Sequence, residues 1–198
     1  MLDRRAAPYG LRGMRDDWSH FCRVQGMTGF WGRVWVLFNT PSLLGLWVYR
    51  YGRWAYSWNA PVVNRAARIG YQLLYLWGQH VCKVALDVNA EIGPEVWLAP
   101  TGVILVGHYC RVGRGSFLHG HNTLGLLSGD AGMPRLGDRV HVGPGALLLG
   151  PITLPDDTVI GPNSVVVRSI EKAGGYVGAP AKPYPGPAQA LAPSWKRA

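Results

Sequence analysis

Aliphatic residues recur at every sixth position between residues 92 and 170, a period that neither an α-helix nor a β-strand produces. The register, with two interruptions, contains Ile92, Leu98, Val106, Val112, Leu118, Leu124, Leu136, Val142, Leu148, Leu154, Ile160 and Val166. Four residues after an aliphatic stands a mostly small or apolar residue, as at Val96, Cys110, Ser116, Asn122, Val140, Ala146, Ile152, Thr158 and Ser164. Each hexad therefore predicts one short strand and one corner, with two side chains pointing inward.

Three such hexads close a triangular coil, and glycine often follows the aliphatic residue, where a tight corner tolerates few other residues. The pattern resembles the repeats of the hexapeptide acyltransferases, which form a left-handed parallel β-helix. The alternative, a sandwich of short strands, would alternate with period two and show irregular spacings. We therefore predict a mainly β fold, with a left-handed parallel β-helix over residues 86–182 and an N-terminal α-helical segment over residues 1–85.

The chain before residue 86 has the pattern of helices. Proline and capping residues precede apolar runs, which predicts helices at 30–38, 42–58 and 62–85, with a further short helix around 15–24. The longest uncharged stretch, residues 34–49, is interrupted by Asn39, Thr40 and Pro41 and falls short of the roughly 20 apolar residues that cross a bilayer. We expect no membrane span in this segment.

Positive charge is concentrated in the same part of the chain. The whole sequence has a formal net charge of +9, and residues 1–84 contribute +8 of it, from eleven Lys and Arg against three Asp. Tryptophans between Trp18 and Trp77 alternate with arginines. The positive charge suits anionic lipid or an acidic partner. Such helices fit a membrane surface, because Trp prefers the headgroup region and Arg reaches lipid phosphate. The alternative is that the rings pack together as a helical cap or an oligomer contact. We expect no nucleic-acid partner.

Two segments depart from the repeat. Residues 125–135 skip a hexad, which predicts an extended loop that can reach a neighbouring subunit. Residues 183–198 are rich in proline, which predicts a flexible tail. The three cysteines are an odd number and imply no disulfide framework, and the N-terminus does not have the pattern of a secretory signal. We expect a cytoplasmic protein, with a peripheral position at the inner membrane if the basic helices bind lipid.

Several short motifs resemble serine acetyltransferase in their order and spacing. They are the segments 101–107, 123–125, 134–136, 143–150 and 178–182. The N-terminal helices resemble the aromatic, basic leader of serine-acetyltransferase-like proteins associated with bacterial polysaccharide synthesis. The resemblance implies acetyl transfer from acetyl-CoA, or another acyl-CoA, to a hydroxyl group. It also implies a homotrimer, or a dimer of trimers, with the thioester in a groove between adjacent β-helices.

The family uses a histidine as general base, because an alcohol is a poor nucleophile at neutral pH. At the two positions where the family has histidines, this chain has Ala99 and Met133. The register places Leu118 one coil above Leu98, so His119 is expected in the rung next to Ala99. We predict His119 as the base and His121 as an assisting or substrate-contacting residue. The alternatives are a structural or interfacial role for His119 and a solvated corner that contains His121. The other histidines, His20, His80, His108 and His141, are expected to be non-catalytic.

A carboxylate could orient the base, and Asp130 in the loop or Asp87 before the first coil are the candidates. For the co-substrate, the resemblance implies that glycine-rich corners line the pantetheine arm and that a basic residue lies near the nucleotide. The matching residues are Gly143, Gly145, Gly161, Asn163 and Lys182. The competing explanation for the glycines is that the corners of any such coil require them.

The leading hypothesis is an acyl-CoA-dependent O-acyltransferase, with acetyl-CoA as the expected donor, that modifies a hydroxyl of a sugar or a lipid-linked glycan precursor. A second hypothesis is a non-catalytic hexapeptide protein that organises a biosynthetic complex, since both family histidines are replaced. A third is a metal-dependent trimer resembling γ-class carbonic anhydrase, in which histidines from two chains hold zinc. No metal ligand set is predicted from the sequence itself.

Overall fold

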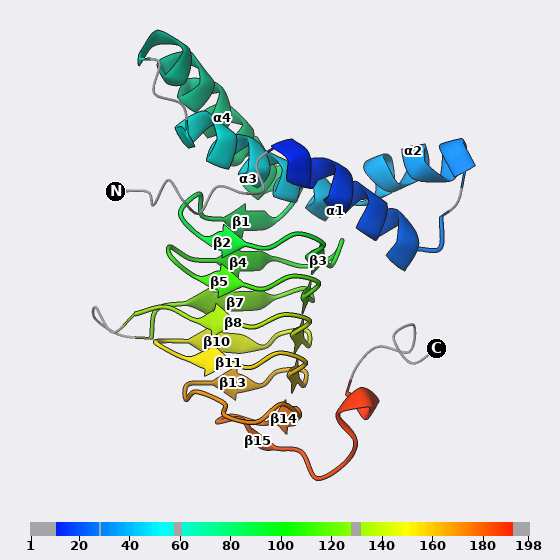
Figure 1. The fold of residues 1–198 in the computed structure, drawn as a ribbon, viewed down its shortest axis with the longest axis vertical. Helices are drawn as coiled ribbons and strands as arrows, with labels where there is room; N and C mark the ends of the chain where they lie inside the picture. The colour runs from blue at the N-terminus through cyan, green and yellow to red at the C-terminus, as the bar shows by residue number, and fades with distance from the viewer. Residues whose placement is uncertain (1–10, 28, 58–60, 128–131, 192–198) are drawn as a thin grey trace.

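The computed structural model describes residues 11–27, 29–57, 61–127 and 132–191. Four α-helices lie at one end of a stack of short strands (Figure 1). They are α1 (Leu11–Val24), α2 (Gly29–Asn39), α3 (Pro41–Ser57) and α4 (Pro61–Val81). The predicted left-handed parallel β-helix with an N-terminal α-helical segment is confirmed.

The strands form three sheets, one on each side of the coil. Sheet A contains β1 (Val84–Leu86), β4 (Ile104–Val106), β7 (Asn122–Gly125), β10 (Leu147–Leu149) and β13 (Val165–Val166). Sheet B contains β2 (Glu91–Ile92), β5 (Arg111–Val112), β8 (Arg135–Leu136) and β11 (Thr153–Leu154). Sheet C contains β3 (Trp97–Leu98), β6 (Phe117–Leu118), β9 (His141–Val142), β12 (Val159–Ile160), β14 (Gly175–Val177) and β15 (Lys182–Pro183).

The six-residue register fills the interior of the coil. In sheet C, Leu98 pairs with Leu118, Leu118 with Val142, and Val142 with Ile160, so that equivalent aliphatic residues stack in one column. All the second inward positions named above are at most 2% exposed, including the polar Ser116, Asn122, Thr158 and Ser164. Each coil therefore buries the apolar interior of its neighbour, which is the source of stability in such repeats.

The corners explain the glycines that lie between the strands. A Cβ atom at Gly120 would lie 2.1 Å from the carbonyl oxygen of Thr101, and one at Gly113 would lie 2.2 Å from that of Gly137. Non-glycine residues also adopt positive φ at the corners, with His121 at 64° and Asn163 at 53°. The backbone of the coil, rather than a ligand, thus dictates much of the glycine pattern.

The end of the last helix differs from the expectation. Helix α4 ends at Val81, and Val84–Leu86 forms the first strand of sheet A, so the predicted continuation of the helix to Ala85 is wrong. Val84 and Leu86 are buried because they pair with Ile104 and Val106 of the next coil, and this tertiary pairing outweighs the helical pattern of the preceding residues. Beyond β15, a short 3-10 helix, η2 (Ala188–Ala190), approaches Gly175 of the last coil.

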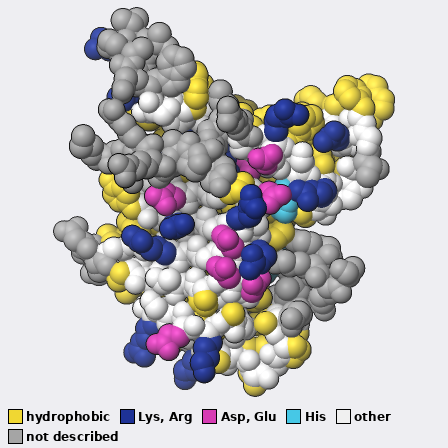
Figure 2. Space-filling view, viewed as in Figure 1, with side chains coloured by type: hydrophobic (Ala, Val, Ile, Leu, Met, Phe, Trp, Pro, Cys, Tyr) yellow, Lys and Arg dark blue, Asp and Glu magenta, His cyan; other side chains and the backbone are white. Residues whose placement is uncertain are grey.

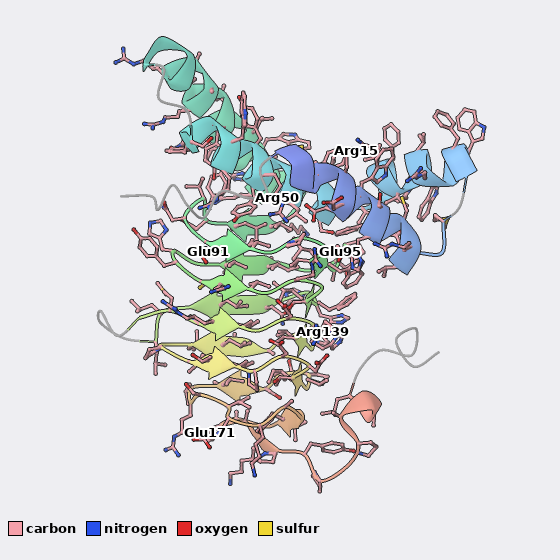
Figure 3. The ribbon with its side chains drawn as sticks, in the orientation of Figure 1. Arg15, Arg50, Glu91, Glu95, Arg139 and Glu171 are labelled. Carbon is pink, nitrogen blue, oxygen red and sulfur yellow. The ribbon has the colours of Figure 1, made fainter. Side chains whose placement is uncertain are left out.

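One buried ion pair joins the helices to the first coils. Arg50 of α3 donates to the carboxylate of Asp17 in α1 at 3.0 and 3.3 Å, and to the carbonyl oxygens of Ile92 and Gly93 at 2.7 and 2.6 Å. Asp17 also accepts from the backbone N–H of Glu95. Figure 3 labels Arg50 at this junction, where side chains from α1, α3 and the coil meet.

Candidate active site

The outer face of sheet C brings the predicted residues into two neighbouring columns. One column contains Trp97, Phe117, His141 and Val159, and the next contains Ala99, His119, Gly143 and Gly161. The backbone N–H of Ala99 donates to the carbonyl oxygen of Leu118 at 2.9 Å. His119 therefore lies in the rung next to Ala99, as the register predicts.

His119 and His141 form a direct contact between adjacent strands. Their Nε2 atoms are 3.1 Å apart and their ring centroids 4.9 Å apart. His141 is 1% exposed, whereas His119 is partly exposed. Only one of the two Nε2 atoms needs to carry the proton for a hydrogen bond to form between neutral rings. Of the two rings, that of His119 is the one exposed to solvent.

An aromatic ladder surrounds this pair. The ring of Trp97 lies 5.5 Å from that of His119, and Phe117 lies 5.7 Å from His141. Helix α1 covers the upper part of the ladder, with Phe21 stacked on Trp97 at 6.3 Å. Burial among these rings lowers the pKa of His119, because an apolar environment disfavours the imidazolium. The neutral, proton-accepting form is therefore favoured at neutral pH.

His20 of α1 packs on Phe117 of the ladder, with ring centroids 5.7 Å apart, and the other three histidines occupy other surroundings. His121 is exposed at a corner, beside Gly102 of the neighbouring coil. Nδ1 of His108 contacts the carboxylate of Asp87, so this carboxylate is paired with His108 rather than with His119. His80 contacts the carbonyl oxygen of Leu76 within α4. In the part of the chain that the structure describes, no ion pair involves His119, and Asp130 lies outside that part.

His141 is predicted to be non-catalytic, although the sequence contains the signal that places it beside His119. Val142 stands in the column of Leu118, so His141 must face outward beside Phe117, diagonally opposite His119. The same register that placed His119 next to Ala99 would have placed His141 one strand further along. The long interruption between Leu124 and Leu136 obscured this relation.

The residues predicted for the co-substrate divide into two groups. Gly143 and Gly161 are buried between coils, and a Cβ atom at Gly143 would lie 2.8 Å from the backbone of Gly161. Gly145 has a φ of 73°, and a Cβ atom there would lie 2.2 Å from Oδ1 of Asn163. The close stacking of neighbouring coils is by itself sufficient to require these three glycines. Asn163 and Lys182 are exposed and can contact a ligand directly.

Lys182 borders a depression at the far end of the β-helix. The depression has a volume of about 430 Å³, and Arg168, Lys172 and Lys182 contribute cationic groups to its wall, with Glu171 as the acidic one. The surplus of positive charge suits phosphate groups such as those of a CoA nucleotide. Among the described residues, no cluster of three or more His, Cys, Asp or Glu could hold a metal ion.

The fold defines the chain as a hexapeptide-repeat parallel β-helix, with a histidine pair on one outer face. No protein-family model matches it. The chain is 31% identical over 147 residues to the serine acetyltransferase of Mycobacterium tuberculosis, an alignment that covers 73% of this chain and 61% of the relative. It is 28% identical over 149 residues to the serine acetyltransferase of Synechococcus elongatus, covering 74% and 58%.

Solved serine acetyltransferase structures share the fold. The enzyme from Brucella abortus superposes with a TM-score of 0.74 at 19% identity, covering 89% of this chain and 69% of that one. The soybean apoenzyme gives 0.73 at 22% identity, covering 87% and 69%. The chain is thus similar to serine acetyltransferases in sequence and fold, and it spans about three fifths of the length of the curated relatives named here.

Proposed function

We propose that the chain is an acyl-CoA-dependent O-acyltransferase of the serine acetyltransferase type, with acetyl-CoA as donor and His119 as general base. The observation that carries the proposal is the 3.1 Å contact between Nε2 of His119 and Nε2 of His141. It lies on the face where, by the resemblance to serine acetyltransferase, Ala99 takes the position of the base. The sequence similarity to serine acetyltransferases supports the class of reaction. A solved serine acetyltransferase with this fold is a complex with CoA.

The pair supplies a base if His119 donates its Nε2 proton to Nε2 of His141. Nδ1 of His119 then holds a free lone pair and accepts the proton of the acceptor hydroxyl. The hydroxyl oxygen attacks the thioester carbonyl, the carbon–sulfur bond breaks, and the leaving thiolate takes the proton back from Nδ1. During this cycle, His141 stabilises the imidazolium through the Nε2 hydrogen bond, as the third member of a catalytic triad does.

The other parts of the proposal follow from the resemblance and the surface. His121 would contact the acceptor, and Asn163 and Lys182 would bind CoA together with the corners at Gly143, Gly145 and Gly161. A neighbouring copy would complete the groove, so a homotrimer is proposed. The acceptor would be a hydroxyl of a sugar or a lipid-linked glycan, and a protein that modifies a lipid-linked acceptor would associate with the inner membrane surface.

The direct test is release of CoA thiol from acetyl-CoA by the purified protein in the presence of different acceptors. We expect acceptor-dependent release with a sugar or a glycolipid and a lower rate with free serine. Thiol release that depends on serine alone would contradict the proposed acceptor but retain the reaction class. The absence of release with every acceptor, together with no CoA binding by calorimetry, would contradict the reaction class as well.

A second candidate function is a non-catalytic scaffold of a biosynthetic complex. The resemblance to serine acetyltransferase implies that Ala99 and Met133 take the positions of both family histidines, which favours this candidate. Ala99 is buried, and its methyl side chain cannot act as a base. CoA binding separates the two candidates, because a scaffold has no need of the acyl donor.

The pH dependence of the reaction is a further expected result. Because burial lowers the pKa of His119, the base becomes protonated, and activity falls, only below the ordinary histidine pKa of about 6.5. The acid limb of the kcat/KM profile should therefore lie at a lower pH than 6.5. A limb above that value would show that a group other than the buried His119 controls the rate.

A further inference from the structure

Helix α2 exposes an uninterrupted apolar face. Phe30, Trp31 and Phe38 are 73%, 79% and 83% exposed, and Trp35 is 48% exposed. With 100° between successive helical residues, these four fall on one side of the helix, whereas the buried Val36 lies on the other. Figure 2 shows the hydrophobic patch that α2 carries away from the rest of the molecule.

Helix α4 has a second such face. Ile69, Leu73, Leu76 and Trp77 are 58%, 65%, 53% and 46% exposed, at helical spacing. The buried Tyr71 and Gly78 lie on another side of the helix. Both helices extend from the same end of the β-helix (Figure 1). Single exposed apolar residues are common on protein surfaces, but these two helices each expose several on one face. The two faces therefore indicate a contact surface.

The charged residues in the segment that contains these faces are all positive. The sequence contains no Asp or Glu between Trp18 and Leu86, while Arg33, Arg65, Arg68 and Lys83 are exposed there. The guanidinium of Arg33 lies 5.3 Å from the ring centre of Trp18, and that of Arg68 lies 4.5 Å from that of Tyr56. A second copy placed on these faces would bring like charges together with no carboxylate in this segment to balance them. An anionic surface complements them.

A groove between α1 and α2 continues the apolar face of α2. It has a volume of about 730 Å³ and is lined by Trp18, Met27, Phe30, Arg33 and Val34, among others. Its wall is mainly apolar with arginine at the rim, which matches the boundary between acyl chains and headgroups. In the described residues, no helix is long and apolar enough to cross a bilayer. The apolar faces can therefore lie in the bilayer surface but not span it.

We infer that the exposed faces of α2 and α4 bind the surface of an anionic phospholipid bilayer, with the aromatic rings of α2 inserted at the headgroup level and the arginines on lipid phosphate. This inference rests on the proposed membrane association and names the surface responsible for it. Binding through this surface would hold the site on sheet C near a lipid-linked acceptor. It is separate from the histidine pair, so lipid binding and acetyl transfer can each fail without the other.

The test is sedimentation of the full chain with vesicles of phosphatidylcholine alone or mixed with phosphatidylglycerol. We expect binding to the mixed vesicles that weakens as salt is raised, and a blue shift of tryptophan fluorescence. The triple variant Phe30→Ser/Trp31→Ser/Phe38→Ser should lose about tenfold or more in binding, because it removes the inserted rings. Arg65→Glu should weaken binding to the mixed vesicles only.

Two matched variants on the β-helix control for loss of an exposed ring and for charge reversal. Tyr109→Ser and Arg111→Glu alter exposed residues away from the helices and should retain wild-type binding. Equal binding of the wild type to both vesicle types, or no binding, would overturn the inference. So would a triple variant that binds vesicles normally but forms a smaller oligomer by analytical ultracentrifugation, because a second copy would then cover the face. Unchanged thiol release with a soluble acceptor would separate lipid docking from catalysis.

Discussion

Replacement of His119 by alanine is expected to lower the rate of acetyl transfer by about 10²–10⁴-fold, the usual contribution of a general base. The effect should appear in kcat, because the base acts on the acceptor proton in the transition state and contributes little to ground-state binding. CoA thiol release measured over a range of acceptor concentrations gives kcat and KM separately. CoA binding by calorimetry should be unchanged in this variant.

The neighbouring histidines supply the controls for this prediction. His141→Phe keeps an aromatic ring in a buried position but removes both nitrogens, so we expect a smaller loss of kcat and an altered pH profile, as a positioning residue would give. His121→Ala should mainly raise the KM for the acceptor. His80→Ala, in α4, should leave the rate unchanged. Full activity of the His119→Ala variant would refute the role of His119 as base. Loss of all measurable turnover in the His121→Ala variant would assign that role to His121 instead.

The β-helix was predictable from the sequence because its period is a direct consequence of its geometry. Each coil repeats the same inward positions, so the sequence alone predicts Leu98 and Leu118 in one column, as the structure has them. The same argument placed His119 beside Ala99. It required only that the backbone pairing continue without a break between the two residues.

The remainder of the site depended on contacts that the period does not encode. The pairing of His119 with His141 crosses the interruption that contains residues 125–135, where the repeat count is lost. The pairing of Asp87 with His108 depends on side-chain directions at a corner, and spacing alone did not choose between Asp87 and Asp130. The helix boundary at Val81 was missed because Val84 and Leu86 are buried by strand pairing with the following coil.

Replacement of Arg50 by methionine is expected to destabilise the junction between the helices and the β-helix by about 3–5 kcal/mol, because the variant leaves the buried carboxylate of Asp17 without its charged partner. Asp17 is 0% exposed and Arg50 is 2% exposed, so water cannot replace the lost contacts. The carbonyl oxygens of Ile92 and Gly93 would lose their donor as well. Denaturant unfolding measures the loss of stability.

Hydrogen exchange locates the effect. We expect faster exchange in α1 and α3 of the Arg50→Met variant and unchanged exchange in the later coils, since each coil is stabilised mainly by its neighbours. Arg15→Met, which alters an exposed arginine of the same helical segment, should shift stability by no more than about 0.5 kcal/mol. The double variant Arg50→Met/Asp17→Leu should recover part of the loss, because it removes the unpaired charge. A loss in Arg50→Met no larger than that in Arg15→Met would mean that packing of the helices, rather than the ion pair, holds them on the first coils.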